Sequence, residues 1–295
     1  MHVYNFETYD VFTTQKFAGN QLAVVMDAIG LTDDEMQAIT REFNLSETTF
    51  VFPPDDPAHE ARIRIFTLGY EMPFAGHPTV GTSVAIARAR AIEKEMVLEL
   101  KAGLFPIRID MTGKTPFAEF KNPNLPVEVG PAPAPAALEK ALSMRAGTIS
   151  DGACAPRCLS AGAAFVYAHA ALEDVQNAKL DYGAFDAMEM DDVVGVLLYA
   201  EGGVEKNATY HTRMFAPNAG IPEDPATGSA AAALPGHVAL SQTLGDGRHD
   251  WLIEQGYELG RPSQINAQID VKSGDIQSIK IGGNAVLVQQ GKLYL

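Results

Sequence analysis

The chain has 295 residues, of which 46% are hydrophobic and 20% charged, and its formal net charge is −15. This is an ordinary globular composition. Its acidity disfavours nucleic acid and anionic membrane surfaces as partners, because binding phosphate requires lysine and arginine. The sequence contains neither an apolar run of about 18 residues, as a membrane span needs, nor the pattern of a secretory signal. The two cysteines, Cys154 and Cys158, suit ordinary thiols in a reducing compartment, so we expect a cytoplasmic protein.

The N-terminal half predicts short strands and two helices. Thr32 is followed three residues later by Glu35, which is the pattern of a capping box, and apolar residues then repeat at helical spacing over 31–44. Residues 79–92 predict a second helix whose small apolar middle indicates that other elements surround it. Alternation and branched residues predict the strands, which cover 2–12, 22–26, 48–53, 62–66 and a hairpin over 96–110 turning near Gly103.

Residues 122–137 carry five prolines and show no helical or strand period. They predict a linker, and so an N-terminal domain over 1–120 and a C-terminal domain over 121–295. At the end of the chain, 276–295 predict strands that turn through Gly282-Gly283-Asn284. Packing of the last strand back on the first domain is left open.

The two halves resemble each other around one segment, "RIRIFTLGYEMPFAGHPTVGTS" in the first and "HTRMFAPNAGIPEDPATGSA" in the second. Each copy predicts a strand, a loop with proline and glycine, and an alanine-rich helix. If this similarity is not chance, two similar domains share a cleft lined by their loop–helix junctions, which is a preferred place for ligands. The predicted matches are Arg64 with Arg213, Phe66 with Phe215, Pro73 with Pro222, Pro78 with Pro225 and Gly81 with Gly228.

Both loop–helix junctions have the chemistry of an anion site. The first N–H groups of a helix have no partner within the helix and carry partial positive charge. A phosphate loop is a glycine-rich segment that ends in Gly-Lys-Ser/Thr, and no such segment is present, so a carboxylate is the expected ligand. The binding candidates are Gly76, Thr227, Gly228 and Ser229. The alternative is that Asp224 only caps its helix.

Two titratable residues suggest proton transfer. His77 stands at a glycine-flanked helix start, which favours a neutral imidazole able to give or accept a proton; a purely structural histidine is the alternative. Glu47, preceded by Ser46, opens a predicted strand and either faces water or faces the cleft. Burial in the cleft would raise its pKa above about 4.3 and suit it to acid–base catalysis near neutral pH.

Several of these stretches together resemble the PhzF-like isomerases of phenazine biosynthesis. They are "AGNQLAVV", "NLSETTFV", "EMPFAGHPTVG", "RMFAP", "EDPATGSA" and "GYELGRPS", in that order from about residue 8 to about residue 265. The resemblance implies an α+β fold like that of diaminopimelate epimerase. Such a fold has two similar domains, each a curved, mostly antiparallel sheet wrapped around a central helix. It further implies isomerisation of trans-2,3-dihydro-3-hydroxyanthranilate without metal or organic cofactor, and a homodimer.

By the same resemblance, Glu47 is the acid–base carboxylate, and His77 and Asp224 are its polar companions. Ser46, Gly76, Gly228 and Ser229 fall on the substrate-binding loops. Two departures from the family pattern bear on the pocket. Leu68-Gly69-Tyr70 follow "IRIFT" where proline is usual, and Pro235-Gly236 fall within the second helix, which we expect to be short or kinked.

The sequence therefore predicts a cofactor-independent isomerase that moves a proton on a small carboxylate-bearing substrate. A non-catalytic small-molecule-binding protein of the same fold is the alternative. A metal-dependent hydrolase with Glu47, His77 and Asp224 as ligands comes third, and we expect no metal.

Overall fold

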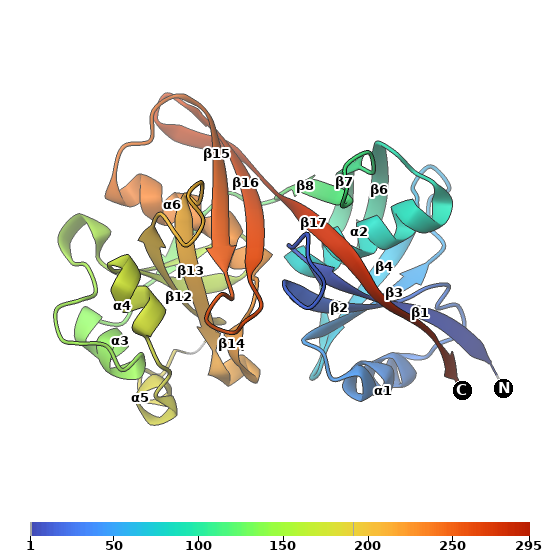
Figure 1. Ribbon diagram of the computed structural model, residues 1–295, viewed down its shortest axis with the longest axis horizontal. Coiled ribbons are helices and arrows are strands. Elements are labelled where there is room, and N and C mark those ends of the chain that lie inside the picture. Colours follow the sequence, from blue (N-terminus) through green and yellow to red (C-terminus); the bar gives the residue numbers. More distant parts are fainter. Residues whose placement is uncertain (1, 191) are drawn as a thin grey trace. The chain divides into compact units, whose positions relative to one another are not determined.

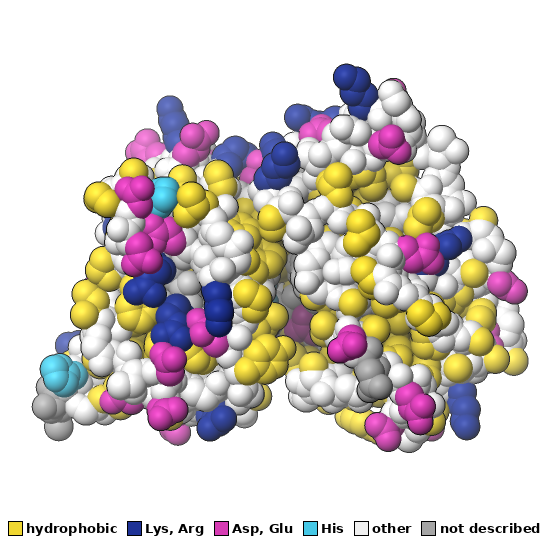
Figure 2. Space-filling view, turned by 180° about the vertical axis from the view of Figure 1, so that it is seen from behind, with side chains coloured by type: hydrophobic (Ala, Val, Ile, Leu, Met, Phe, Trp, Pro, Cys, Tyr) yellow, Lys and Arg dark blue, Asp and Glu magenta, His cyan; other side chains and the backbone are white. Residues whose placement is uncertain are grey.

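The structure, a computed structural model, describes residues 2–190 and 192–295. The chain divides into two compact units (Figure 1). The N-terminal unit is formed by residues 1–121 and 282–295, and the C-terminal unit by residues 122–281. On the face shown in Figure 2, acidic side chains are scattered over each unit rather than gathered in one patch.

In the described part of the N-terminal unit, eight strands pair in a closed ring, in the order β1-β2-β3-β4-β6-β7-β8-β17 and back to β1. The β2–β3 and β4–β6 pairs are parallel, and β5 adds to β4. The strands are β1 (Val3–Val11), β2 (Asn20–Val25), β3 (Glu47–Phe52), β4 (Ala61–Thr67), β5 (Glu71–Met72), β6 (Glu95–Leu100), β7 (Gly103–Asp110), β8 (Phe117–Lys121) and β17 (Asp275–Tyr294).

Two helices complete this unit. α1 (Asp33–Phe43) begins with the predicted capping box, in which Thr32 Oγ1 accepts from the Glu35 N–H and Glu35 Oε2 accepts from the Thr32 N–H. α2 (Gly76–Arg90) is buried over its first twelve residues and contacts β1, β2, β3, β7 and β8. A Cβ at Gly81 would lie 2.6 Å from Leu22 Cδ2, so this glycine allows the helix to approach the sheet.

The C-terminal unit repeats this plan around α6 (Gly228–Ser241), whose middle is buried. α3 (Pro135–Ala141), α4 (Leu172–Asn177) and α5 (Tyr182–Asp186) pack in one apolar cluster with the sheet. The strands are β9 (Val127–Gly130), β10 (Arg157–Ser160), β11 (Ala164–His169), β12 (Gly195–Glu201), β13 (Tyr210–Ala216), β14 (Ile221–Asp224), β15 (Gly247–Gln255), β16 (Ser263–Lys272) and the first part of β17.

Strand pairing confirms the internal repeat. In each unit a parallel pair, an antiparallel pair and a second parallel pair follow in the same order: β2–β3, β3–β4 and β4–β6 in one, β11–β12, β12–β13 and β13–β15 in the other. Arg64 on β4 and Arg213 on β13 occupy matching places. Each arginine forms a two-bond pair with a carboxylate, Glu71 or Glu223, with all four distances at 2.8 Å.

The predicted match beyond the strands was wrong in its offset. Ile65 pairs with Met72, and its counterpart Met214 pairs with Asp224. Six residues (66–71) therefore separate the first pair and nine (215–223) the second. The three extra residues make Pro73 the counterpart of Pro225 rather than of Pro222.

Three other predictions need correction. β17 runs unbroken through Gly282-Gly283-Asn284, and a Cβ at Gly282 would lie 2.9 Å from the Ala118 carbonyl oxygen. Gly282 serves close strand packing, not a turn. The predicted linker contains β9 and begins α3. α6 is not short, since it continues past Pro235. A Cβ at Gly236 would lie 2.4 Å from Pro126 Cβ, so the residue after the proline allows close packing there.

Candidate functional site

Glu47 and His77 meet in the N-terminal unit because their elements are neighbours. Glu47 is the first residue of β3, opposite Leu22 on β2 and Thr67 on β4, and His77 is the second residue of α2. The His77 Nε2 atom lies 3.4 Å from Glu47 Oε2. Hydrogen bonds of this kind are usually shorter, but catalytic contacts are often long until substrate binds.

Both side chains are largely removed from solvent. The side chain of Glu47 is 13% exposed and that of His77 is 5% exposed. Glu47 Oε2 accepts no hydrogen bond from the residues that the structure describes. A buried acceptor without a partner is costly, so this oxygen is suited to receive a proton or a substrate group.

Burial raises the pKa of the Glu47 carboxyl to about 7, an effect that the Ser46 hydroxyl partly offsets. Burial acts in this direction because it penalises the charged form. The shift is the one that the sequence analysis expected for a glutamate that does not face water. A carboxyl with this pKa exists in both protonation states near neutral pH, as an acid–base catalyst requires.

The remaining predicted residues of this unit lie around the pair. Ser46 directly precedes Glu47 and donates to Asn20 Oδ1 at 3.4 Å. Gly76 is buried and opens α2, with Ala75 as N-cap. Helix N–H groups at such a start are available to an anion.

Asp224, Thr227, Gly228 and Ser229 lie in the C-terminal unit, at the start of α6. Asp224 ends β14 and is 9% exposed. The N-cap of α6 is Thr227, whose hydroxyl donates to Asp224 Oδ2. The alternative that Asp224 itself caps the helix is therefore wrong. Asp224 instead accepts a hydrogen bond from the hydroxyl of Thr227, the N-cap residue.

Gln255, which the sequence patterns did not single out, ends β15 and is 1% exposed. Its side-chain amide makes three hydrogen bonds to the segment from Asp224 to Thr227. Its one sequence signal was its place just before "GYELGRPS", a motif to which no role had been given.

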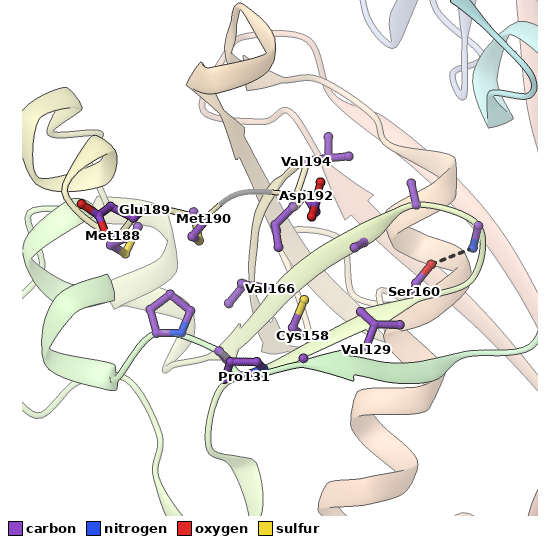
Figure 3. A pocket seen from close by; sticks show the side chains of 17 residues that line it. Val129, Pro131, Cys158, Ser160, Val166, Met188, Glu189, Met190, Asp192 and Val194 are labelled. Atoms are coloured by element: carbon purple, nitrogen blue, oxygen red, sulfur yellow. Dashed lines mark hydrogen bonds between the residues drawn. The ribbon is translucent and has the colours of Figure 1, made fainter.

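A separate pocket of about 770 Å³ opens in the C-terminal unit, and the predicted site residues are not among those lining it. Figure 3 shows Cys158 and Val166 on the strands at its base, with Met188 and Met190 on the loop after α5. Cys158 is buried and not in a disulfide, and burial raises the pKa of its thiol.

Within 2–190 and 192–295, no group of three or more His, Cys, Asp or Glu side chains is arranged to hold a metal ion. No helix there is long and apolar enough to cross a membrane.

Comparison with known proteins links these features to one family. Residues 9–291 match the profile of the PhzC-PhzF family, described as phenazine biosynthesis-like protein. An uncharacterised isomerase of Mesorhizobium japonicum is 41% identical, over all of both chains. The trans-2,3-dihydro-3-hydroxyanthranilate isomerase of Pseudomonas aeruginosa is 32% identical, over 99% of this chain and 100% of the relative.

Solved structures agree. A PhzF-family phenazine biosynthesis protein of Bacillus anthracis superposes with a TM-score of 0.89, at 27% identity and over 100% of both chains. A hydroxyproline epimerase of Agrobacterium vitis shares the fold, with a TM-score of 0.62 at 13% identity, over 99% of this chain and 92% of the other. The likeness to epimerases that the sequence predicted therefore holds at the level of the fold.

Proposed function

The chain belongs to the PhzF family of phenazine biosynthesis-like proteins and is an isomerase, and we propose that Glu47 moves the proton in its reaction. The proposed substrate is a small molecule that bears a carboxylate. The observation that carries the proposal is the buried contact between Glu47 and His77 at the start of α2, with the pKa of Glu47 near 7.

The proposed reaction moves one proton between two carbons. The Glu47 carboxylate removes a proton from the first carbon, and the electron pair of that C–H bond shifts along the conjugated system. The resulting carboxylic acid then returns the proton to a second carbon, so that atoms and charge balance without an oxidant or reductant. A pKa near 7 limits the free-energy difference between the two states of the carboxyl, which is what a group that both takes and gives a proton needs.

His77 is proposed to assist at 3.4 Å, by exchanging a hydrogen bond with Glu47 or with the substrate as the carboxyl changes state. The N–H groups at the start of α2 are proposed to stabilise negative charge that develops on the substrate. Both contributions come from one rigid element, because α2 is buried among strands.

Asp224, Thr227, Gly228 and Ser229 are proposed to bind substrate, with Asp224 as a further polar group in the reaction. Support comes from family membership and from the order around Asp224, which is buried and bonded to the N-cap of α6. We also propose, from family membership, that the chain acts as a homodimer.

The test replaces Glu47 by Gln, which keeps the shape and removes the ionisable group. The first probe is trans-2,3-dihydro-3-hydroxyanthranilate, the substrate in the name of the P. aeruginosa relative, followed by a panel of small unsaturated carboxylates. Entry of solvent deuterium into the product is followed by NMR. We expect the Glu47→Gln variant to lose at least about 10³-fold in turnover.

Glu42→Gln provides the matched control, because Glu42 is exposed near the end of α1 and should leave turnover unchanged. Near-normal turnover or deuterium exchange in Glu47→Gln would contradict the proposed role. For the wild type, kcat/KM should rise with pH up to about 7, as the carboxylate forms.

A further inference from the structure

Gln255, the last residue of β15, bonds to the Asp224 segment through its side-chain amide. Its Nε2 group donates to the Asp224 carbonyl oxygen at 2.7 Å and to Thr227 Oγ1 at 3.0 Å, and its Oε1 accepts from the Thr227 N–H at 3.1 Å. These contacts span 28 to 31 residues of sequence. A neutral amide offers two donor hydrogens and one acceptor oxygen, so all of these groups are used.

The backbone fixes which way this amide points. The Thr227 N–H can only donate and the Asp224 carbonyl can only accept, so exchanging the amide nitrogen and oxygen would set donor against donor and acceptor against acceptor. Gln255 is also 1% exposed, and water does not compete for these bonds. The orientation is therefore set by the segment that it holds.

The same amide sets the direction of the Thr227 hydroxyl. Because Nε2 can only donate, Thr227 Oγ1 must accept from it, which leaves the one hydroxyl hydrogen for Asp224 Oδ2. A relay of directed hydrogen bonds thus runs from Gln255 through Thr227 to the Asp224 carboxylate.

Backbone packing beside Gln255 reinforces this arrangement. Gly256 has a φ of +78°, and a Cβ there would lie 2.6 Å from the Pro225 carbonyl oxygen and 2.6 Å from that of Arg261. The end of β15 therefore lies directly against the Asp224–Thr227 segment. In the N-terminal unit, the counterpart of Gln255 is Leu100, which cannot make such bonds.

From this geometry we propose that Gln255 is a positioning residue that orients the Asp224 carboxylate and the start of α6 for substrate, acting through Thr227. The inference rests on the proposed function in giving Asp224 a role in the reaction. It assigns Gln255 no contact with the substrate.

The first test needs no substrate. Gln255→Leu removes all three hydrogen bonds and keeps a side chain that is unbranched at Cβ. Amide hydrogen exchange of residues 224–231 is then compared between this variant and the wild type, both as the full chain. We expect exchange of the Thr227 amide to accelerate at least about 10-fold, while thermal unfolding remains cooperative. Unchanged exchange would overturn the proposal. Gln268→Leu is the matched control, since Gln268 on β16 bonds to the exposed Asp250 and should leave the 224–231 amides unaffected.

The second test is a double-mutant cycle with turnover as readout. Gln255→Leu should lower kcat/KM about 10- to 100-fold, as misplacement of a reacting group does, but less than about 3-fold further on the Asp224→Asn background. Equal losses on both backgrounds would show that Gln255 acts elsewhere and would overturn the proposal. Gln255→Glu keeps the acceptor but turns negative charge toward Asp224, so its loss should be at least as large.

Failure of the proposed function would look different. If Asp224→Asn and Glu47→Gln both kept normal turnover, the role of these residues in the reaction would be refuted. The exchange test would still decide whether Gln255 orders the segment.

Discussion

The two units share one scaffold and differ at the start of the central helix. In the N-terminal unit the segment reads Met72-Pro-Phe-Ala-Gly-His77, and at the matching positions the C-terminal unit reads Asp224-Pro-Ala-Thr-Gly-Ser229. A carboxylate replaces a thioether at one end, and a hydroxyl replaces an imidazole at the other. The proline and the helix-opening glycine are common to both, so the frame persists where the chemistry has changed.

The shared frame also includes, in each unit, a buried carboxylate that accepts hydrogen bonds from backbone N–H groups. At the end of β6, Glu99 accepts from the N–H groups of Asp55 and Asp56, and at the end of β15, Glu254 accepts from those of Val204 and Glu205. Each glutamate thereby fixes the loop after an equivalent strand, β3 in the N-terminal unit and β12 in the C-terminal unit. The repetition of this device in both units indicates that it maintains the fold rather than the reaction.

The largest expected effect comes from making the two helix starts alike. His77→Ser gives the N-terminal unit the residue of its counterpart, and we expect turnover to fall about 10²- to 10⁴-fold, because the proposed acid–base partner of Glu47 is lost. Steady-state kinetics measure this, with the half-buried His249, which bonds to the Gly245 carbonyl oxygen, changed to Ser as the control. Ser229→His should not restore the loss. An active His77→Ser variant would mean that the difference between the helix starts is unrelated to catalysis.

The next largest expected effect is a difference in stability between variants of the two arginine–glutamate pairs. Arg213 is 7% exposed and also donates to three main-chain carbonyl oxygens, whereas Arg64 is 20% exposed and shares its charge with the exposed Asp33. Arg213→Met should lower the free energy of unfolding by about 3–5 kcal/mol and Arg64→Met by about 1 kcal/mol. Urea unfolding at pH 7 measures both. Equal costs would contradict the difference in burial.

Glu47 should destabilise the fold in a pH-dependent way. Its pKa is about 7 in the folded chain against a reference of 4.5, so the stability present below pH 4.5 is lost as pH rises through 7. At about 1.4 kcal/mol per pKa unit, the loss is on the order of 3 kcal/mol. Glu47→Gln should therefore be more stabilising at pH 8 than at pH 4.5, by urea unfolding. A pH-independent difference would mean that the carboxylate is not held in a buried site.

The smallest effect tests the exchange of Leu100 and Gln255. Leu100 is 8% exposed, so Leu100→Gln buries an amide whose partners are provided only in the other unit. We expect a cost of about 1–3 kcal/mol, measured by thermal unfolding. An unchanged stability would show that the N-terminal unit also provides hydrogen-bond partners for an amide at position 100. The two units would then not differ in this respect.

Much of the fold could be predicted from local patterns. The capping box at Thr32 and the alternating strands depend on neighbouring residues, and the repeat was visible because the arginine of β4 recurs in β13. His77 stood out because a titratable group beside a glycine at a helix start is unusual, and Glu47 because it opens a predicted strand. Their 3.4 Å contact could not be predicted in the same way, since it requires β3 and α2 to be packed together.

The errors arose where tertiary contacts override local signals. Gly282 and Gly283 have the pattern of a turn, but the strand continues through them. At Gly282 the glycine is required because Phe117, Ala118 and Glu119 leave no room for a Cβ. The offset between the halves was wrong because three extra residues lie in one hairpin and not in the other. Gln255 was missed because its partners lie 28 to 31 residues away, in another element.

The course of β17 has a consequence for synthesis on the ribosome. Residues 122–281 form one continuous stretch, but the N-terminal ring of strands is completed only by residues 282–295. The first 121 residues leave the exit tunnel earlier, but the strand that closes their ring is made only after the C-terminal unit. The unit translated first is thus the last to finish folding. Until residues 282–295 are made, Glu47 belongs to an open sheet, whereas the C-terminal unit can already be complete.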